Sequence, residues 1–282
     1  MTITLRAMTA ADADFGWSLT RQTNWPHRLQ DWQDALRLGD GLLAEENGQP
    51  LGTAVCWRWG ERWATIGLVV VDEQQQGRGI GRRLMEGLLA GLEGYQVRLH
   101  ATAAGQGLYT RLGFTPVGEI HQYQCPQLPT IAAPSLNNGQ RLRAATLADA
   151  SHLSTLDQQA HGLARPALIA WLLRQSTSMQ VLEQHGRIAG FGALRPFGRG
   201  YVIGPVIADS AEHARLLISS LMSEVGGEFV RIDTDAALGL GHWLAECGLQ
   251  PVDAPVTMIR GTPWQPEAGG MQAWTLMTQA MA

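Results

Sequence analysis

The chain has 282 residues, about twice the size of an ordinary domain, so two domains of similar size are expected. Its 21 lysines plus arginines face 25 aspartates plus glutamates, and a formal net charge of −4 excludes a broad basic surface for nucleic acid or anionic membranes. The start lacks a signal-peptide pattern, no apolar run could span a bilayer, and three separated cysteines give no disulfide framework. We therefore expect a cytoplasmic monomer or homodimer without membrane or nucleic-acid partners.

The two halves of the sequence repeat each other at an offset of about 137 residues. Leu5–Ala13 returns as Leu142–Ala150, with seven of nine positions identical. Three further segments return in the same order: Asn47–Gly52 as His185–Gly190, Gly67–Asp72 as Gly204–Asp209, and Leu112–Val117 as Cys247–Val252. Four matches in order at nearly one offset indicate an internal duplication.

The duplication predicts two α/β (α+β) domains in tandem. We expect the first over residues 1–125, an extended proline-containing linker over 126–139, and the second, with a tail, over 140–282. In each half a strand is followed by amphipathic helices, a strand hairpin at Gly48 or Gly186, a long apolar strand, a helix, a strand, a short helix and a closing strand. This order predicts a mixed sheet with helices on its faces.

A glycine-rich turn over residues 74–83 follows the apolar strand that ends at Val71, and an amphipathic helix is expected from about Arg78 to Leu92. Such a turn directs backbone N–H groups and the positive end of a helix dipole at one point, which suits a phosphate. Three arginines begin this helix: Arg78, Arg82 and Arg83. Cations are unfavourable there, and a bound polyanion would offset that cost. A plain glycine-rich helix start with solvated arginines is the alternative.

Together with a later tyrosine segment, this loop resembles the GNAT family of acyl-CoA-dependent N-acetyltransferases. The family's two signatures are met by Gln76, Gly79 and Gly81 in the loop, and by Tyr109, Gly113 and Phe114 in a Tyr-x-x-x-Gly-Phe segment. The resemblance covers residues 1 to about 125 well and, through the repeat, extends more weakly to about 140–262. It implies a tandem GNAT protein in which each domain has a mostly antiparallel twisted sheet with helices on both faces.

The resemblance implies acetyl-CoA as cosubstrate and assigns residues to it. The strand Val69, Val70 and Val71 would hold the pantetheine arm, with backbone contacts at Val69 and Val71. The backbone of the loop would hold the pyrophosphate through Gln76, Gly77, Arg78, Gly79, Ile80, Gly81 and Arg82. Tyr109 matches the general acid that protonates the departing CoA thiolate, and a structural core tyrosine is the alternative.

The implied activity is transfer of an acetyl group to a primary amine of a small molecule or peptide, by direct attack in a ternary complex. A non-catalytic acyl-CoA sensor or scaffold is the alternative, because Trp63–Leu68 lacks the carboxylate that many family members carry on this strand. Proton removal would then run through ordered water or a residue that the sequence does not place. Glu61, the nearest carboxylate in the sequence, is expected in a solvated turn. The histidines show no metal-ligand spacing, so no metal is expected.

The acceptor pocket is expected from the first helices and the early hairpin, with Asn24, Trp25 and Trp59 as candidate substrate residues. Other indoles nearby are Trp32, Trp57 and Trp63. A cluster of exposed indoles would suit an aromatic or cationic amine. Packing of these strand tryptophans under the helices is the alternative.

The second half lacks the glycine loop. At an offset of 137, Gln76–Gly81 falls on His213–Ile218, which contains no glycine, and Leu244 stands at the equivalent of Tyr109. Side chains there would prevent close approach of a pyrophosphate, and Glu212 adds an unfavourable charge. We expect a degenerate GNAT domain that covers the first sheet or walls the acceptor site. The tail over residues 264–282 is expected to dock on the body as a short apolar element.

Overall fold

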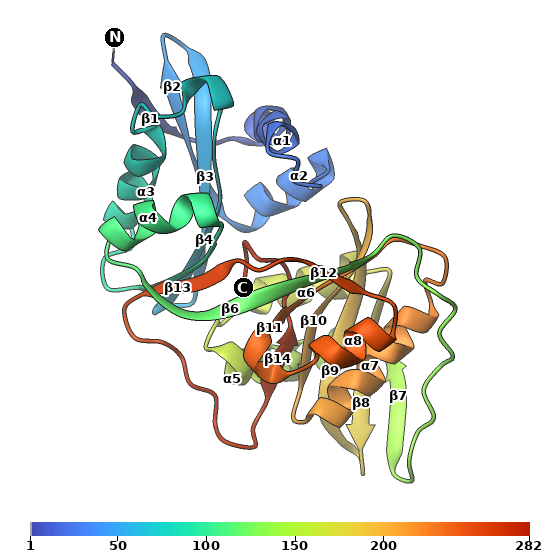
Figure 1. Ribbon diagram of the computed structural model, residues 1–282. Coiled ribbons are helices and arrows are strands. Elements are labelled where there is room, and N and C mark those ends of the chain that lie inside the picture. The colour runs from blue at the N-terminus through green and yellow to red at the C-terminus, as the bar shows by residue number, and fades with distance from the viewer. Residues whose placement is uncertain (1) are drawn as a thin grey trace.

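A computed structural model describes residues 2–282 and shows two lobes, one for most of each half of the chain (Figure 1). The first half forms β1 (Thr4–Ala7), η1 (Ala10–Asp12), α1 (Ala13–Gln22), α2 (Leu29–Leu38), β2 (Asp40–Glu46), β3 (Gln49–Trp59), β4 (Trp63–Val71), η2 (Glu73–Gln75), α3 (Ile80–Ala90), β5 (Gln96–Ala101), α4 (Ala103–Arg111) and β6 (Thr115–Cys125). Residues 126–137 form neither helix nor strand.

The second half repeats this order and adds strands at its end. It forms β7 (Gln140–Ala144), η3 (Leu147–Asp149), α5 (Ala150–His161), α6 (Pro166–Gln175), β8 (Ser178–Gln184), β9 (Arg187–Phe197), β10 (Gly200–Ala208), α7 (Ala211–Ser223), β11 (Val230–Asp235), η4 (Ala236–Leu238), α8 (Gly241–Glu246), β12 (Gln250–Asp253), β13 (Val256–Arg260) and β14 (Gln272–Thr275). The strand and helix order predicted for both halves is confirmed, except that the second half closes with two short strands, β12 and β13.

The repeated Thr-x-x-Asp segment makes the same local structure twice. The Thr9 amide donates to Asp12 (2.7 Å), and the Thr146 amide donates to Asp149 (2.8 Å), each bond capping the start of a helical segment. Arg6 binds Asp12 at 2.7 Å, just as Arg143 binds Asp149 at 2.8 Å. The duplication is therefore visible in individual hydrogen bonds as well as in the element order.

The two halves exchange strands. β13, from the second half, pairs antiparallel with both β5 and β6 and lies between them. β6, from the first half, continues alongside β11 of the second. One 14-stranded sheet results, and Figure 1 shows β6 running from one lobe to the other, with β13 beside its first part. The sheet is mixed and mostly antiparallel, as predicted, but the sequence did not indicate that it would be continuous.

The helices cover both faces of the sheet, and one core joins the two halves. The predicted inner face of α3 is confirmed, because Ile80, Leu84, Met85 and Leu88 are buried. The helix itself begins and ends two residues inside the predicted range. A central cluster combines α1–α2 residues and the strand beneath them with α5–α6 residues, for example Trp32, Trp57, Leu168 and Ile169. The lobes are therefore packed against each other through apolar side chains.

Within residues 2–282, no helix is both long and apolar enough to cross a membrane. The same part of the chain holds no group of three His, Cys, Asp or Glu side chains arranged to bind a metal ion.

Candidate active site

Strands β4 and β5 separate after a short stretch of pairing. They run parallel and pair only where Trp63–Thr65 lies beside Gln96–Arg98. Beyond this point the pairing of β3 with β4 shifts register between Thr53 and Val55, and Leu68 adopts φ +52°. The β5-facing edge of β4 then carries backbone N–H and C=O groups without a neighbouring strand. A cavity of about 580 Å³ fills the gap.

The glycine loop and the beginning of α3 form one end of this cavity. Gly77 and Gly79 adopt φ +78° and +76°, and a Cβ on either would meet no atom within 4 Å. Both residues therefore leave open space in front of the N-terminal amides of α3, where an anion is favoured. All the expected cosubstrate residues except Arg78 line the cavity: Val69, Val70, Val71, Gln76, Gly77, Gly79, Ile80, Gly81 and Arg82.

The loop arginines are less available than the sequence suggested. Arg78 binds both carboxylate oxygens of Glu46 at 2.9 Å and does not line the cavity. Arg82 pairs with Glu86 at 2.7 Å but still lines the cavity. Arg83 donates to the carbonyl oxygen of Ile3 at 3.3 Å. The expectation that three free cations await a polyanion is therefore corrected: carboxylates already neutralise two of them.

Tyr109 lies on α4 and lines the same cavity. Its ring packs edge-on against Phe114, with ring centroids 6.1 Å apart, and a Cβ on Gly105 would lie 2.7 Å from it. The side chain is only 9% exposed, and burial raises the pKa of its hydroxyl to about 12. Tyr109 is thus held rigidly by the core and keeps its proton at neutral pH, which a general acid requires.

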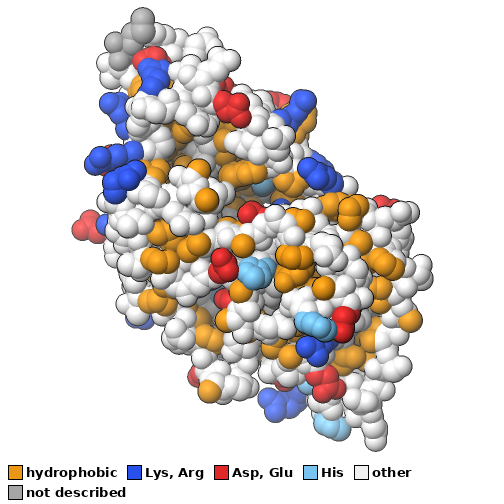
Figure 2. All heavy atoms as spheres, viewed as in Figure 1, with side chains coloured by type: hydrophobic (Ala, Val, Ile, Leu, Met, Phe, Trp, Pro, Cys, Tyr) orange, Lys and Arg blue, Asp and Glu red, His pale blue; other side chains and the backbone are white. Residues whose placement is uncertain are grey.

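A second cavity of about 360 Å³ adjoins the first. The two share several lining residues: Trp25, Ile66, Gly67, Leu68, His100 and Thr102. Figure 2 shows the surface hollowed between the lobes, with hydrophobic side chains visible there. Asn24 and Trp25, two of the predicted substrate residues, line this second cavity. We call it the acceptor cavity.

The indole prediction is corrected by the structure. Trp59 is 4% exposed, donates to Thr65 through Nε1 at 2.9 Å and lines neither cavity. Trp32, Trp57 and Trp63 are buried as well, and Trp57 donates to the carbonyl oxygen of Ala35 on α2 at 3.1 Å. The strand tryptophans bury their apolar area beneath the helices, so the alternative of core packing holds for them.

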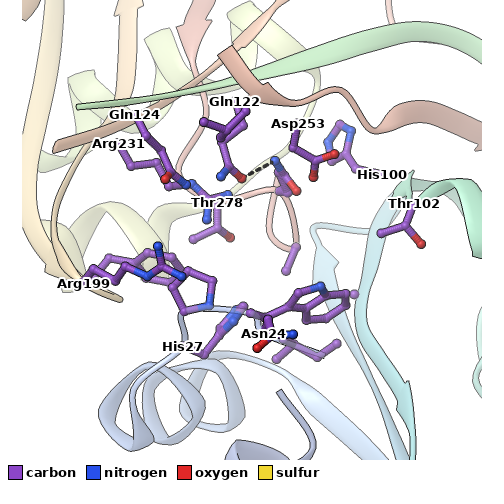
Figure 3. Close-up of a pocket in the computed structure, with 18 of the residues that line it drawn as sticks. Asn24, His27, His100, Thr102, Gln122, Gln124, Arg199, Arg231, Asp253 and Thr278 are labelled. Atoms are coloured by element: carbon purple, nitrogen blue, oxygen red, sulfur yellow. Dashed lines mark hydrogen bonds between the residues drawn. The ribbon is translucent and has the colours of Figure 1, made fainter. Parts of the chain in front are cut away.

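Much of the acceptor cavity comes from parts of the chain that the sequence did not indicate. Figure 3 shows these residues around the hollow: Gln122 and Gln124 from β6, Arg199 from the β9–β10 turn, Arg231 from β11, Asp253 from β12, and Thr278 from the tail. Gln279 donates to Gln122 at 3.2 Å. Contacts between the two halves, the strand exchange among them, bring these residues to the first lobe, and no local sequence pattern could have identified them.

The histidines at this site are neutral. Nδ1 of His100 lies 3.1 Å from the Thr257 hydroxyl, and its Nε2 lies 3.3 Å from the Ala282 carbonyl oxygen. Both ring nitrogens therefore have a hydrogen-bond partner. Burial, followed by the charge of Arg98, lowers the pKa of His100 to about 3. Burial likewise lowers the pKa of His27 to about 4. With pKa values this low, neither imidazole readily holds a proton taken from a substrate near pH 7, so neither is suited to act as a general base.

Asp253 is the one carboxylate among residues 2–282 that lines either cavity. It lies on the second half, at the end of β12. Strand β4 carries no carboxylate, and Glu61 is exposed in the turn between β3 and β4, as predicted. A proton acceptor near the acceptor amine would therefore be water or Asp253.

In the second half, the corresponding gap is filled. β10 pairs parallel with β11 only at Tyr201 and Val202, as β4 does with β5. Farther along, however, β14 pairs antiparallel with Val206–Ala208, the counterpart of Val69–Val71. His213–Ile218 lies inside α7, whose first turn is capped by the Ser210 hydroxyl, and Leu244 is fully buried. The chain's own strand thus occupies the place of the first cavity.

Comparison with known proteins agrees with this architecture. Residues 38–116 and residues 153–271 each match a sequence family described as "Acetyltransferase (GNAT) domain". The chain is 29% identical over 201 residues to "Uncharacterized N-acetyltransferase YitH" of Bacillus subtilis. The match covers 69% of this chain and 68% of that protein.

Solved structures share the fold over nearly the whole chain. A putative acetyltransferase from Pyrococcus horikoshii matches with a TM-score of 0.79 and 20% identity, covering 99% of this chain and 96% of that one. A tandem GNAT protein from the clavulanic acid biosynthesis pathway matches with a TM-score of 0.62 and 15% identity, covering 93% and 99%. The solved structures show a shared fold, and the two sequence matches, one in each half, show that the chain belongs to the GNAT acetyltransferase family and carries two of its domains in tandem.

Proposed function

We propose that this chain is an acetyl-CoA-dependent N-acetyltransferase with one active site, in the first half. The continuity of the two cavities carries the proposal. One cavity runs from the glycine loop along the unpaired edge of β4 to Tyr109, and it shares Leu68 and His100 with the acceptor cavity. An acyl thioester lying in the first would present its carbonyl to a ligand in the second.

The residues of the first cavity fit acetyl-CoA. The free edge of β4 can hydrogen-bond to the amides of the pantetheine arm as a neighbouring strand would. The α3 amides, uncovered by Gly77 and Gly79, suit the pyrophosphate. Arg111 also lines this cavity and adds positive charge, whereas the charge of Arg82 is offset by Glu86.

The proposed reaction is direct acetyl transfer. The neutral amine nitrogen attacks the thioester carbonyl carbon, a C–N bond forms and the C–S bond breaks. An N–H group of β4 stabilises the oxyanion, and the nitrogen releases a proton to water or Asp253. The departing thiolate takes a proton from the Tyr109 hydroxyl, which solvent then replaces.

Release of free CoA thiol from acetyl-CoA, measured with a panel of primary amines, tests this proposal. The printed sequence contains no lysine, so acetylation of the protein's own side-chain amines cannot produce the signal. Amine-dependent thiol release, with the acetylated product seen by mass spectrometry, would support a transferase. Tight acetyl-CoA binding without release from any amine would instead establish the sensor or scaffold alternative.

A further inference from the structure

The acceptor cavity has opposite charges on its two sides. Asp253 lies on the side of His100 and Thr102, the residues that also line the acetyl-CoA cavity (Figure 3). Arg199 and Arg231 lie on the opposite side of the hollow. Because His27 and His100 stay neutral, these three are the charged side chains of the cavity lining; Arg231 is paired with Asp233, whereas Arg199 and Asp253 are not paired with any described residue.

The arginine side offers hydrogen-bond donors that the protein leaves free. Arg231 is 6% exposed and binds Asp233 through Nε and Nη2, the latter at 2.8 Å, while its guanidinium group lies 5.4 Å from the Phe197 ring centre. Nη1 makes no hydrogen bond to any described residue. Arg199 is exposed and has no ion-pair partner among residues 2–282. The arrangement can bind an anionic group through charge-assisted hydrogen bonds.

The turn that carries Arg199 is fixed to the first lobe. The Gly198 amide donates to Asp31 on α2 at 3.1 Å, and Arg28 donates to the Pro196 carbonyl oxygen at 2.9 Å. Arg28 also binds Asp31 at 2.6 Å. These bonds hold the second half's hairpin over the α1–α2 loop, so Arg199 has a set place at the cavity.

The side of the acceptor cavity that carries Asp253 is suited to the amino group of an acceptor molecule. Asp253 accepts a hydrogen bond from the Ala254 amide at 2.9 Å and pairs with no cation in the described chain. It lies beside the junction of the two cavities, where the nitrogen must stand to reach the thioester carbonyl. A free carboxylate there favours an ammonium group arriving from solvent.

We propose that the acceptor is a small zwitterionic amine, such as an amino acid, whose amino group is held at Asp253 and whose anionic group is held by Arg199 and Arg231. This deepens and rests on the proposed transferase function. A cavity of about 360 Å³ is the size of a small-molecule site, so the acceptor enters as a free small molecule. A carboxylate and a phosphate ester share the required chemistry.

Matched acceptors test the proposal. We would compare kcat/KM for ω-amino acids of two to six carbons with alkylamines of equal length, with the corresponding amino amides, and with aminoalkyl phosphates. We expect the anionic amines to exceed their neutral partners by about tenfold or more, because charged hydrogen bonds are lost in the latter. The carboxylate and phosphate series identify which anion is preferred. Equal or better use of alkylamines would overturn the proposal.

Variants locate the anion site. Arg199→Gln should reduce the preference for anionic over neutral amines severalfold, and Arg199→Glu should reverse it. Arg187→Gln, an exposed arginine at the start of β9, the strand that leads to the turn of Arg199, should leave the preference unchanged. Asp253→Asn should raise KM for the amine and leave acetyl-CoA affinity intact. An unchanged preference in both Arg199 variants would assign the site elsewhere and refute the proposal.

A binding measurement separates this proposal from the transferase function. Calorimetry on the CoA-saturated full chain should detect the preferred amino acid and fail to detect the alkylamine. If the amino acid binds while no thiol is released from any amine, the transferase fails and the zwitterion site stands. If thiol is released with neutral amines and no amino acid binds, the zwitterion site fails and the transferase stands.

Discussion

The indole Nε1 of Trp274 donates a 3.0 Å hydrogen bond to the carbonyl oxygen of Ala208, the residue that the repeat equates with Val71. Around this bond β14 covers the edge of β10, and the Thr234 hydroxyl donates to the Trp274 carbonyl oxygen at 2.7 Å. The second lobe therefore closes with its own backbone the gap that the first lobe leaves open.

The first prediction concerns stoichiometry. One acetyl-CoA should bind per chain in calorimetry, because β14 fills the second gap and α7 begins without a glycine loop. Trp274→Ala should lower the free energy of unfolding by about 3–5 kcal/mol, since it removes a large buried side chain. This variant should still bind one molecule, because it restores no pyrophosphate site. A second binding event in either protein would contradict the assignment of one site to the first lobe.

The second prediction concerns the pyrophosphate site. Gly79 has positive φ, so any side chain there strains the backbone, whereas a Cβ on Gly81 would meet Leu108 and Val71 at an ordinary 3.7 Å. Gly81→Glu places an acidic group in the first turn of α3, which favours the helix but repels an anion. We expect acetyl-CoA affinity to fall at least about 100-fold while the melting temperature is maintained. Gly81→Ala, the control, should retain most of the affinity, and an equal loss in both variants would exclude the charge effect.

The third prediction concerns Tyr109. Removing its hydroxyl in Tyr109→Phe should lower kcat by about 100-fold with little change in the Kd of acetyl-CoA. Because its pKa is about 12, the hydroxyl stays protonated up to pH 10, so it should cause no loss of activity below that pH. Tyr95→Phe, in the turn before β5, serves as a control. Full activity of Tyr109→Phe would make Tyr109 a structural residue.

The fourth prediction concerns acid stability. His27 packs between Trp25 and Phe197, and no described residue hydrogen-bonds its Nδ1. Its folded pKa of about 4 lies below the ordinary value of 6.5, so the unfolded chain binds an extra proton between those pH values. The free energy of unfolding should thus fall as pH drops from 6.5 to 4, by about 2 kcal/mol at pH 5 for this residue.

His27→Phe tests this contribution because it preserves an aromatic ring without a titrating group. Urea unfolding at pH 8 and pH 5 should show a smaller difference for this variant than for the original chain. His152→Gln, on the exposed face of α5, should leave the difference unchanged. An equal difference for His27→Phe and the original chain would show that His27 does not set the acid response.

The sequence alone determined the features that depend on local chemistry. The duplication follows from residue matches at one offset, the buried face of α3 from apolar periodicity, and the loop from its closely spaced glycines, two of which adopt positive φ. Helix α3 begins at Ile80 rather than Arg78 because Gly79 lies outside the helix in a left-handed conformation. The start of α3 therefore differs from the predicted start by two residues, because the backbone conformation of Gly79 decides it.

Tertiary structure alone decided which segments meet. The indoles of Trp57 and Trp59 could face either solvent or core in a strand of alternating side chains, and the packing of α2 over β3 placed them inside. Likewise β13 is a short apolar strand that many edges could accept, yet it lies between β5 and β6. Pairing of strands far apart in the chain depends on the register and on the free edges that the whole fold presents. Pairing of β12 with β6 places Asp253 at the acceptor cavity, and the hydrogen bond from the Gly198 amide to Asp31 places Arg199 there, although nothing near either residue in the sequence indicates a site.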